Sequence, residues 1–310
     1  MQTLRDYFKS ARTCSMATRK IGLEVETLFC DRGSAPITKD QSQVMMNQLV
    51  ACGWTIAESK QGMTTKLVKS LPGRGDFFVF YELGWNNVEV VTPTYSICDR
   101  AGLLQDVRGD ILPEVYEVSP CGPLGDYCDF SENEDTLMLP DQRDQIWLKL
   151  DGDVLPVLGH IASVHINIDL CSIAEGFEFM RLTNQMYRQM DWPPKVVADI
   201  WSRYIGESLA DYEVGRYGLP PGNFEDYISR LSGYKVFMNT LGGQLSVLSD
   251  PKPFCDTSDV DLDMFLRSVW WWNRLRVRNG QLVLEIRGIP RGSDDQMVVD
   301  CQDLFSLLKL

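Results

Sequence analysis

The chain has 310 residues, a formal net charge of −13, and 44% hydrophobic and 24% charged residues. This composition is typical of a globular protein with a substantial core, and an acidic chain without a run of lysine or arginine argues against nucleic acid or an anionic membrane as a partner. Nine cysteines form no Cys-x-x-Cys pair, so neither a disulfide framework nor a zinc knuckle is expected. Since no stretch reaches the roughly 18 apolar residues of a membrane span and no signal-peptide pattern begins the chain, we expect one cytoplasmic domain, residues 1–310.

The segment 20–29 is predicted to be a β-strand with one apolar and one acidic face. A period of two places Leu23 and Val25 on the apolar face and Glu24 and Glu26 on the other. Two carboxylates at i and i+2 repel each other, and burying an unpaired one is costly, so this face requires a cation if it is buried. A hard divalent ion, Mg²⁺ or Mn²⁺, would supply the charge. Taken alone, the segment fits an edge strand with two solvated glutamates better.

A β-hairpin is predicted further along the chain. The runs 76–83 and 88–93 are rich in aromatic and β-branched residues and flank the turn-prone residues 84–87. With a four-residue loop, Glu82 would lie directly opposite Glu89 across the pair. Opposed glutamates destabilise a sheet unless a cation lies between them, so the hairpin carries a second acidic pair.

The spacing of apolar residues predicts most of the remaining elements. Residues 54–70 are expected to form one or two short strands, and residues 119–146 a long loop. Helices are expected at residues 42–52, 99–118, 173–190, 195–208, 223–231, 261–277 and 293–309.

The segment 161–170 alternates between apolar and polar residues, which predicts a third strand with one polar face. Ser163, His165 and Asn167 share that face. A lone histidine on such a strand is more often a hydrogen-bonded structural residue than a metal ligand.

Two arginines lie in segments that suit anion binding. Asn279-Gly280 is the strongest hairpin signal in the sequence, and in the strand that follows it Glu285 and Arg287 share a face. Arg216 lies in a loop rich in glycine and proline, where backbone N–H groups beside an arginine suit an anion, although a solvent-exposed loop arginine is the commoner outcome.

Four predicted strands therefore place carboxylates and one imidazole on their polar faces. An α+β protein has this pattern when one face of an antiparallel sheet packs on helices and the other lines a polar cavity. A ligand set rich in carboxylates, without thiolates, favours Mg²⁺ or Mn²⁺ over zinc. The candidate metal ligands are Glu24, Glu26, Glu82, Glu89, His165 and Glu285.

Five short motifs occur in a characteristic order between residues 20 and 290. They are Gly22-Leu-Glu24-Val-Glu26, Glu82 with Asn87-Val-Glu89-Val-Val-Thr-Pro93, Val164-His165-Ile-Asn167, Trp272-Asn-Arg274, and Leu284-Glu285-Ile-Arg287. Together they resemble the glutamate-cysteine ligase and carboxylate-amine ligase group of the glutamine-synthetase-like superfamily. Asn87 stands where this group usually has glutamine, and Ser163 stands where it usually has the first histidine of a His-x-His pair.

The resemblance implies a fold, a reaction and residue roles. The fold would be a curved antiparallel sheet whose polar face holds Mg²⁺ ions that bridge the phosphates of ATP. The enzyme would activate a carboxylate, with glutamate the expected donor, as an acyl phosphate and join it to an amine such as cysteine, releasing ADP. The resemblance implies that the six candidate ligands hold metal and that Arg287 and Glu285 take part in catalysis. Arg274 and Asn87 would contact ATP or substrate. Arg216, in the loop rich in glycine and proline, is a further candidate for such a contact.

Two other readings stay open at this point. A carboxylate-bridged metallohydrolase also uses acidic clusters and two metal ions but needs no ATP. A non-catalytic relative would keep the fold and bind a metal, a nucleotide or a partner without turnover. The sequence leaves open the amine, the number of metal ions and whether the chain forms a homo-oligomer.

Overall fold

The computed structural model describes residues 2–31, 35–119, 142–190, 195–207, 221–241 and 244–310. In this part of the chain, one antiparallel sheet has the strand order β10-β11-β7-β1-β5-β4-β3-β2, and a short strand, β6, pairs with the start of β1. The strands of this sheet are β1 (Lys20–Leu28), β2 (Thr55–Lys60), β3 (Met63–Leu71), β4 (Gly75–Tyr81), β5 (Asn87–Val91), β6 (Tyr95–Ser96), β7 (Ser163–Asp169), β10 (Asn273–Arg278) and β11 (Gln281–Pro290).

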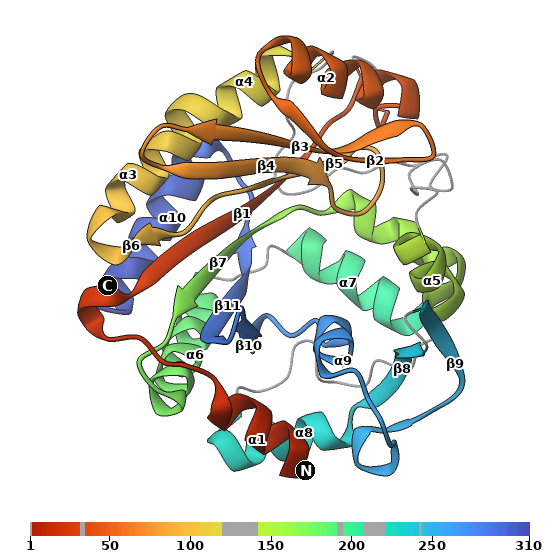
Figure 1. Ribbon diagram of the computed structural model, residues 1–310, viewed down its shortest axis with the longest axis vertical. Coiled ribbons are helices and arrows are strands. Elements are labelled where there is room, and N and C mark those ends of the chain that lie inside the picture. The colour runs from red at the N-terminus through yellow and green to blue at the C-terminus, as the bar shows by residue number, and fades with distance from the viewer. Residues whose placement is uncertain (1, 32–34, 120–141, 191–194, 208–220, 242–243) are drawn as a thin grey trace.

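Helices lie on both sides of this sheet, so the protein is a mixed helix and antiparallel-sheet protein (Figure 1). One side carries α2 (Lys39–Ala51), α3 (Arg100–Gln105), α4 (Leu112–Glu117), α6 (Ile173–Gln189) and α10 (Asp294–Leu307). The other side faces α5 (Gln142–Asp151), α7 (Lys195–Glu207), α9 (Leu262–Ser268) and a separate hairpin of β8 (Lys235–Leu241) and β9 (Gln244–Pro253). Near the N-terminus, α1 (Gln2–Ser10) packs against α8 (Phe224–Gly233).

The main core lies between the sheet and the first group of helices. Residues at alternate positions of the central strands point into it and are at most 1% exposed: Leu23, Val25, Val90, Ile166 and Leu284. Because side chains alternate along a strand, the residues at the intervening positions point to the other side of the sheet. We call the elements on that side, α5, α7, α9 and the β8–β9 hairpin, the second layer. Among the described residues, no helix is long and apolar enough to cross a membrane.

Most predicted helices are confirmed, and side-chain caps explain where several begin. Thr38, Ser172, Asn223 and Ser293 each accept a hydrogen bond from a backbone N–H of the first turn, which satisfies a donor that the helix itself leaves free. The predicted helix 99–118 is continuous but changes hydrogen-bonding pattern, since a π-helical segment (Asp106–Ile111) separates α3 from α4. The predicted loop 119–146 is described only at its ends, and from Gln142 onward it is helical.

The predicted helix 261–277 is wrong over its second half. The helix ends at Ser268, and residues 273–278 are the extended strand β10, which pairs with β11. Asn279 and Gly280 both have positive φ, 51° and 76°, so they form the tight turn that the sequence predicts. The turn sets the register in which β10 pairs with β11, from Arg278 opposite Gln281 to Asn273 opposite Ile286. The pairing outweighs the helical spacing of the aromatic residues before it.

Candidate functional site

The acidic residues predicted as metal ligands lie together on the polar face of the sheet. β1 is central, with β7 on one side and β5 on the other. The register places Glu24 opposite His165 and Glu26 opposite Glu89. Glu285 comes from β11, the next strand beyond β7. All of these residues line one cavity of about 1010 Å³, which lies between the sheet and the second layer.

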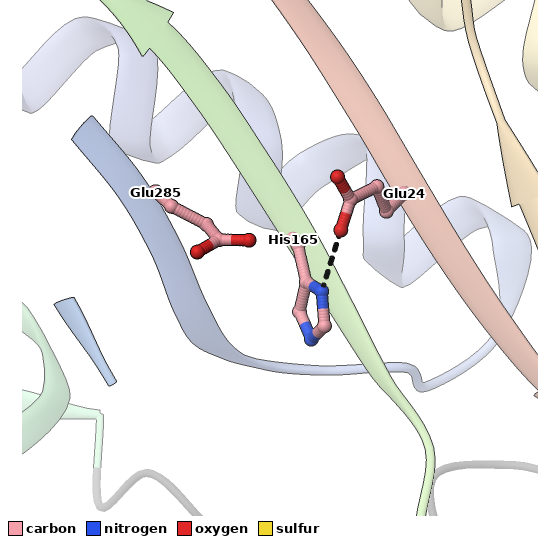
Figure 2. Close-up of side chains that lie close together, drawn as sticks. All are labelled: Glu24, His165 and Glu285. Atoms are coloured by element: carbon pink, nitrogen blue, oxygen red, sulfur yellow. Dashed lines mark hydrogen bonds and ion pairs between the residues drawn. The ribbon is translucent and has the colours of Figure 1, made fainter. Parts of the chain in front are cut away.

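Glu24, His165 and Glu285 form the first of two groups, which we call the arginine-side cluster. One potential ligand atom of each residue lies within 4.8 Å of the other two. Figure 2 shows the three side chains reaching toward one another from neighbouring strands, with His165 Nδ1 3.1 Å from Glu24 Oε2. Asn167 Nδ2 donates to the other oxygen of Glu24 at 3.0 Å.

Two arginines of β10 compensate the negative charge of this cluster. Arg278 donates to Glu24 at 2.9 Å and to Glu285 at 3.0 Å, and Arg274 donates its Nε hydrogen bond to Glu285. Burial alone would raise the pKa of Glu24, but the hydrogen bond with His165 and the charge of Arg278 lower it to about 2. Burial likewise opposes ionisation of Glu285, and the charges of Arg274 and then Arg287 nevertheless hold its pKa well below the usual value. Both carboxylates are therefore charged at neutral pH.

Glu26, Glu82 and Glu89 form the second group, which we call the acidic cluster. One carboxylate oxygen of each lies within 4.8 Å of the other two. Burial raises the pKa of Glu89 well above the usual value, and the charges of Glu82, Glu24 and Glu26 raise it further. Burial raises the pKa of Glu26 as well, although the charge of His165 acts against this. The acidic cluster is thus short of positive charge, unlike the arginine-side cluster.

The structure corrects the predicted pairing of Glu82. Strand β4 ends at Tyr81, and Phe80 is the residue that lies opposite Glu89. Glu82 lies two residues after Phe80, at the start of the loop. Its backbone N–H donates to the Asn87 carbonyl at 3.0 Å. The residue directly opposite Glu89 on its other side is Glu26 of β1. Glu82 still reaches the cluster, and its side chain shares a hydrogen bond with Glu89.

Ser163, at the position where the resembled group usually has histidine, joins the two clusters. Its backbone N–H and its hydroxyl both donate to Glu26 Oε2, at 2.8 and 3.0 Å. The same hydroxyl lies 2.9 Å from His165 Nε2. Since the other ring nitrogen contacts Glu24, His165 bridges an oxygen of each cluster. Ser163 therefore supports two candidate ligands without acting as one.

Arg287 points into the cavity from an irregular part of β11. The register with β7 shifts between Ile286 and Ile289, which indicates a β-bulge. Tyr187 of α6 lies under this bulge and its hydroxyl accepts a hydrogen bond from the Gly288 N–H at 3.2 Å. Arg287 Nε is buried and has no hydrogen-bond partner among the described residues. The Arg287 side chain thus lines the cavity and keeps one buried donor that the described residues leave without a hydrogen-bond partner.

Arg274 is engaged by the protein itself. Besides Glu285, its guanidinium donates to the backbone carbonyls of Leu266 and Val269, at 3.2 and 2.5 Å. These contacts tie the end of α9 to β10. The predicted role of Arg274 as a phosphate or substrate contact stays untested, and the observed contacts indicate a structural one.

Arg276 is a candidate that the sequence reading missed. It shares the strand face of Arg274 and Arg278 and lines the cavity, but makes no hydrogen bond or close ion pair with a described residue. Burial, and then the like charge of Arg274, lower its pKa to about 10. Arginine at every second position would have indicated one strand face, had residues 273–277 not been predicted as the end of a helix.

The two remaining predicted contacts are placed differently. Asn87 is buried at the edge of the cavity, where its Nδ2 donates to the Ile161 carbonyl at 3.4 Å and its Oδ1 has no described partner. Arg216 lies outside the described residues, and its predicted role stays a prediction.

The wall of the cavity opposite the sheet is largely apolar. Trp147 of α5 and Trp270 after α9 have ring centroids 4.6 Å apart, and Trp201 of α7 lies 6.5 Å from Trp270. Met238 of β8 and Leu245 of β9 extend this wall. The cavity therefore combines a charged floor on the sheet with an aromatic roof, an arrangement common in sites for small polar molecules with an apolar part.

Comparisons with known proteins give the following. No protein-family model matches the chain, and no curated protein matches its sequence. A glutamate–cysteine ligase from Francisella tularensis, solved in complex with AMP, has a TM-score of 0.43 and 12% identity over 96% of this chain and 68% of that chain. A bifunctional glutathione synthetase from Pasteurella multocida has a TM-score of 0.43 and 11% identity over 94% of this chain and 38% of that chain.

Proposed function

We propose that this chain is an ATP- and Mg²⁺-dependent ligase that joins a carboxylate to an amine through an acyl phosphate. One observation supports this most strongly: the two clusters of candidate ligands and the Arg287 side chain line the same cavity. Clustered carboxylates beside arginines suit a metal-bound polyphosphate better than a neutral substrate. The sheet would then be the glutamine-synthetase-like catalytic sheet that the motifs resemble.

The acidic cluster is the better cation site of the two. Its donors are three carboxylates, the hard oxygen ligands that Mg²⁺ and Mn²⁺ prefer. The raised pKa of Glu89 arises because burial and nearby carboxylates disfavour its charge, and a divalent cation would remove this penalty. The arginine-side cluster has imidazole and two carboxylates, but Arg274 and Arg278 already balance its charge. A second cation there would require Arg278 to move.

The residues of the chain would divide the work as follows. A donor carboxylate oxygen attacks the γ-phosphorus of ATP, ADP leaves, and the amine then attacks the acyl carbon and displaces inorganic phosphate. Glu26, Glu82 and Glu89 would hold Mg²⁺, which would supply charge neutralisation for the phosphates. We assign Arg287, which lines the cavity, to the transferred phosphoryl group. Arg276 is placed to hold another anionic group of the donor or the nucleotide, and Glu285 orients the arginines around it.

The substrates follow from the same chemistry. The donor must be a carboxylic acid, and glutamate is the donor that the motifs favour. The acceptor is an amine. Trp147, Trp201 and Trp270 line the cavity opposite the sheet and could pack against an apolar part of this amine.

Release of ADP tests this function. The protein is incubated with Mg-ATP and a panel of carboxylic acids and amines, and ADP and AMP are measured. We expect ADP formation that requires both a donor and Mg²⁺, that is lost in Glu89→Gln, and that persists in Glu178→Gln, a matched change of an exposed glutamate on α6. Hydrolysis of esters or amides without ATP would favour a metallohydrolase instead. Nucleotide binding without any ADP would indicate a non-catalytic protein.

A further inference from the structure

Two cysteines that are distant in the sequence lie in contact outside the cavity. Cys14 Sγ and Cys171 Sγ are 3.5 Å apart, although 157 residues separate them along the chain. Both side chains are partly exposed. No spacing motif links these positions, so the sequence alone gives no sign of the pair.

The backbone holds the two segments together independently of the sulfur atoms. The Cys14 N–H donates to the Leu170 carbonyl at 2.9 Å, directly before Cys171. Two residues earlier, Arg12 exchanges backbone hydrogen bonds with Gly280 and Leu282, at the start of β11. The segment that precedes β1 is therefore fixed against the end of β7, which keeps the two thiols in contact.

A buried arginine lies against the pair of thiols. Arg19 is 1% exposed, and its Nη2 donates to Cys171 Sγ at 2.9 Å and to Glu175 at 2.5 Å. A guanidinium that donates to sulfur stabilises the thiolate, which is the nucleophile in thiol–disulfide exchange. For Cys14, burial and the hydrogen bond with Cys171 raise the pKa to about 11, although the hydrogen bond and the charge of Arg19 act against this. Because the hydrogen bond at 2.9 Å runs from Arg19 to Cys171, we assign the attacking role to Cys171 and the resolving role to Cys14.

We propose that Cys14 and Cys171 form a reversible disulfide in exchange with a low-molecular-weight disulfide. The Cys171 thiolate attacks one sulfur of the small disulfide and expels a small thiolate, which leaves a mixed disulfide on Cys171. Cys14 then loses its proton, attacks Cys171 Sγ and expels the second small thiol. The two protein thiols are oxidised, and one small disulfide is reduced to two thiols.

The bond would fasten the N-terminal segment to the strand that carries His165. It would close a loop of 157 residues, which restricts the unfolded chain and raises the melting temperature. It would also leave Arg19 with Glu175 as its ionic partner. This link is independent of the ligase proposal, because neither cysteine lines the cavity.

Oxidised glutathione and peptide mapping test the proposal. After treatment, free thiols are alkylated and the full chain is digested with trypsin, which releases Cys14 in peptide 13–19 and Cys171 in peptide 150–181, each with one cysteine. We expect these two peptides joined in the wild type and in the control Cys98→Ser, which removes an exposed cysteine. Cys14→Ser should stop at a glutathione mixed disulfide on Cys171, and Cys171→Ser should form no link.

Thermal melting provides the second readout. Oxidation should raise the melting temperature of the wild type and of Cys98→Ser by about 5 °C, reversibly with dithiothreitol, and should leave both pair variants unchanged. The proposal would be overturned if Cys14 and Cys171 stayed free after the exposed cysteines had reacted. It would also be overturned if each of the two carried its own glutathione. So would a linked pair that leaves the melting temperature unchanged.

Discussion

Glu26 and Glu89 lie directly opposite each other on the neighbouring strands β1 and β5, and their side chains are almost completely buried. Opposed like charges destabilise a sheet, and burial increases the cost because less water screens them. Glu82 adds a third carboxylate at the same point. The fold without a bound cation thus carries a local electrostatic cost that a divalent cation would relieve.

The first prediction is a pH-dependent stability of the metal-free protein. Burial and neighbouring carboxylates raise the pKa of Glu89 and Glu26 in the fold, so their contribution to stability is present below the unfolded carboxyl pKa of about 4.3 and is lost as the pH rises through the folded values. Glu24 acts in the opposite sense, because its folded pKa of about 2 gives stability above pH ~4.3 that is lost on acidification. The melting temperature of the metal-free protein should therefore decrease as the pH rises from mildly acidic to alkaline. Added Mg²⁺ should make this decrease smaller. A melting temperature independent of both pH and Mg²⁺ would contradict it.

The second prediction separates stability from function at Glu89. Glu89→Gln keeps the shape of the side chain and removes a charge that lies opposite Glu26. We expect the metal-free variant to be more stable by about 1 kcal/mol and inactive, with loss of most of the Mg²⁺-induced rise in melting temperature. For the wild type, saturation at one hundred times the Kd adds about 2.7 kcal/mol. Calorimetry with Mg-ATP on the variant and on Glu178→Gln measures both effects. Full activity in Glu89→Gln would make Glu89 an ordinary buried residue.

The third prediction contrasts two arginines of one strand face. Arg274 pairs with the buried Glu285 and with two backbone carbonyls, so Arg274→Gln should destabilise the fold by about 3–5 kcal/mol. Arg276 has no such contacts, so Arg276→Gln should keep the stability within about 0.5 kcal/mol and lower kcat/KM for the anionic substrates. Urea unfolding and steady-state kinetics of the pair distinguish the two roles. An unstable Arg276→Gln, or a stable and inactive Arg274→Gln, would reverse the assignment.

The fourth prediction concerns the opposite face of β1. Leu23 is 1% exposed in the core between the sheet and its helices, so Leu23→Ala should cost about 2–5 kcal/mol through the cavity that it creates. The folded fraction should keep the wild-type ADP-forming activity, because the polar face is unchanged. Activity per folded molecule, measured below the melting temperature, checks this, and a large loss would show that the two faces of the strand are coupled.

The alternation of residues predicted the polar face well, because the two-residue period of a strand holds wherever one face is buried. Glu24, Glu26, His165 and Glu285 could be assigned to one face from their own segments. The division into two clusters could not be predicted, because it depends on which strands are neighbours in the sheet. Glu26 belongs to the cluster of Glu89, which lies opposite it on β5, and not to the cluster of Glu24 on its own strand. Arg276 was missed for a related reason, since a helical reading of its segment hid the alternation that the Asn279-Gly280 turn imposes.

The pairing of Cys14 with Cys171 shows a third kind of limit. Neither residue lies in a motif, and backbone hydrogen bonds between distant segments, such as the bond from Cys14 to Leu170, bring them together. Contacts of this kind follow from how distant segments pack, so a spacing rule applied to the sequence has no means of finding them.

The central claim is that a carboxylate is activated as an acyl phosphate in this cavity, and trapping with hydroxylamine tests it most directly. Hydroxylamine is small enough to replace an amine of unknown size, and it converts an acyl phosphate into a stable hydroxamate. The protein is incubated with Mg-ATP, glutamate or another donor acid, and hydroxylamine, and hydroxamate, ADP and AMP are measured together. We predict hydroxamate and ADP in equal amounts, with a lower rate in Arg287→Lys because a point charge does not reproduce the contacts of a guanidinium. AMP and pyrophosphate in place of ADP, or ADP without hydroxamate for every donor, would contradict the account.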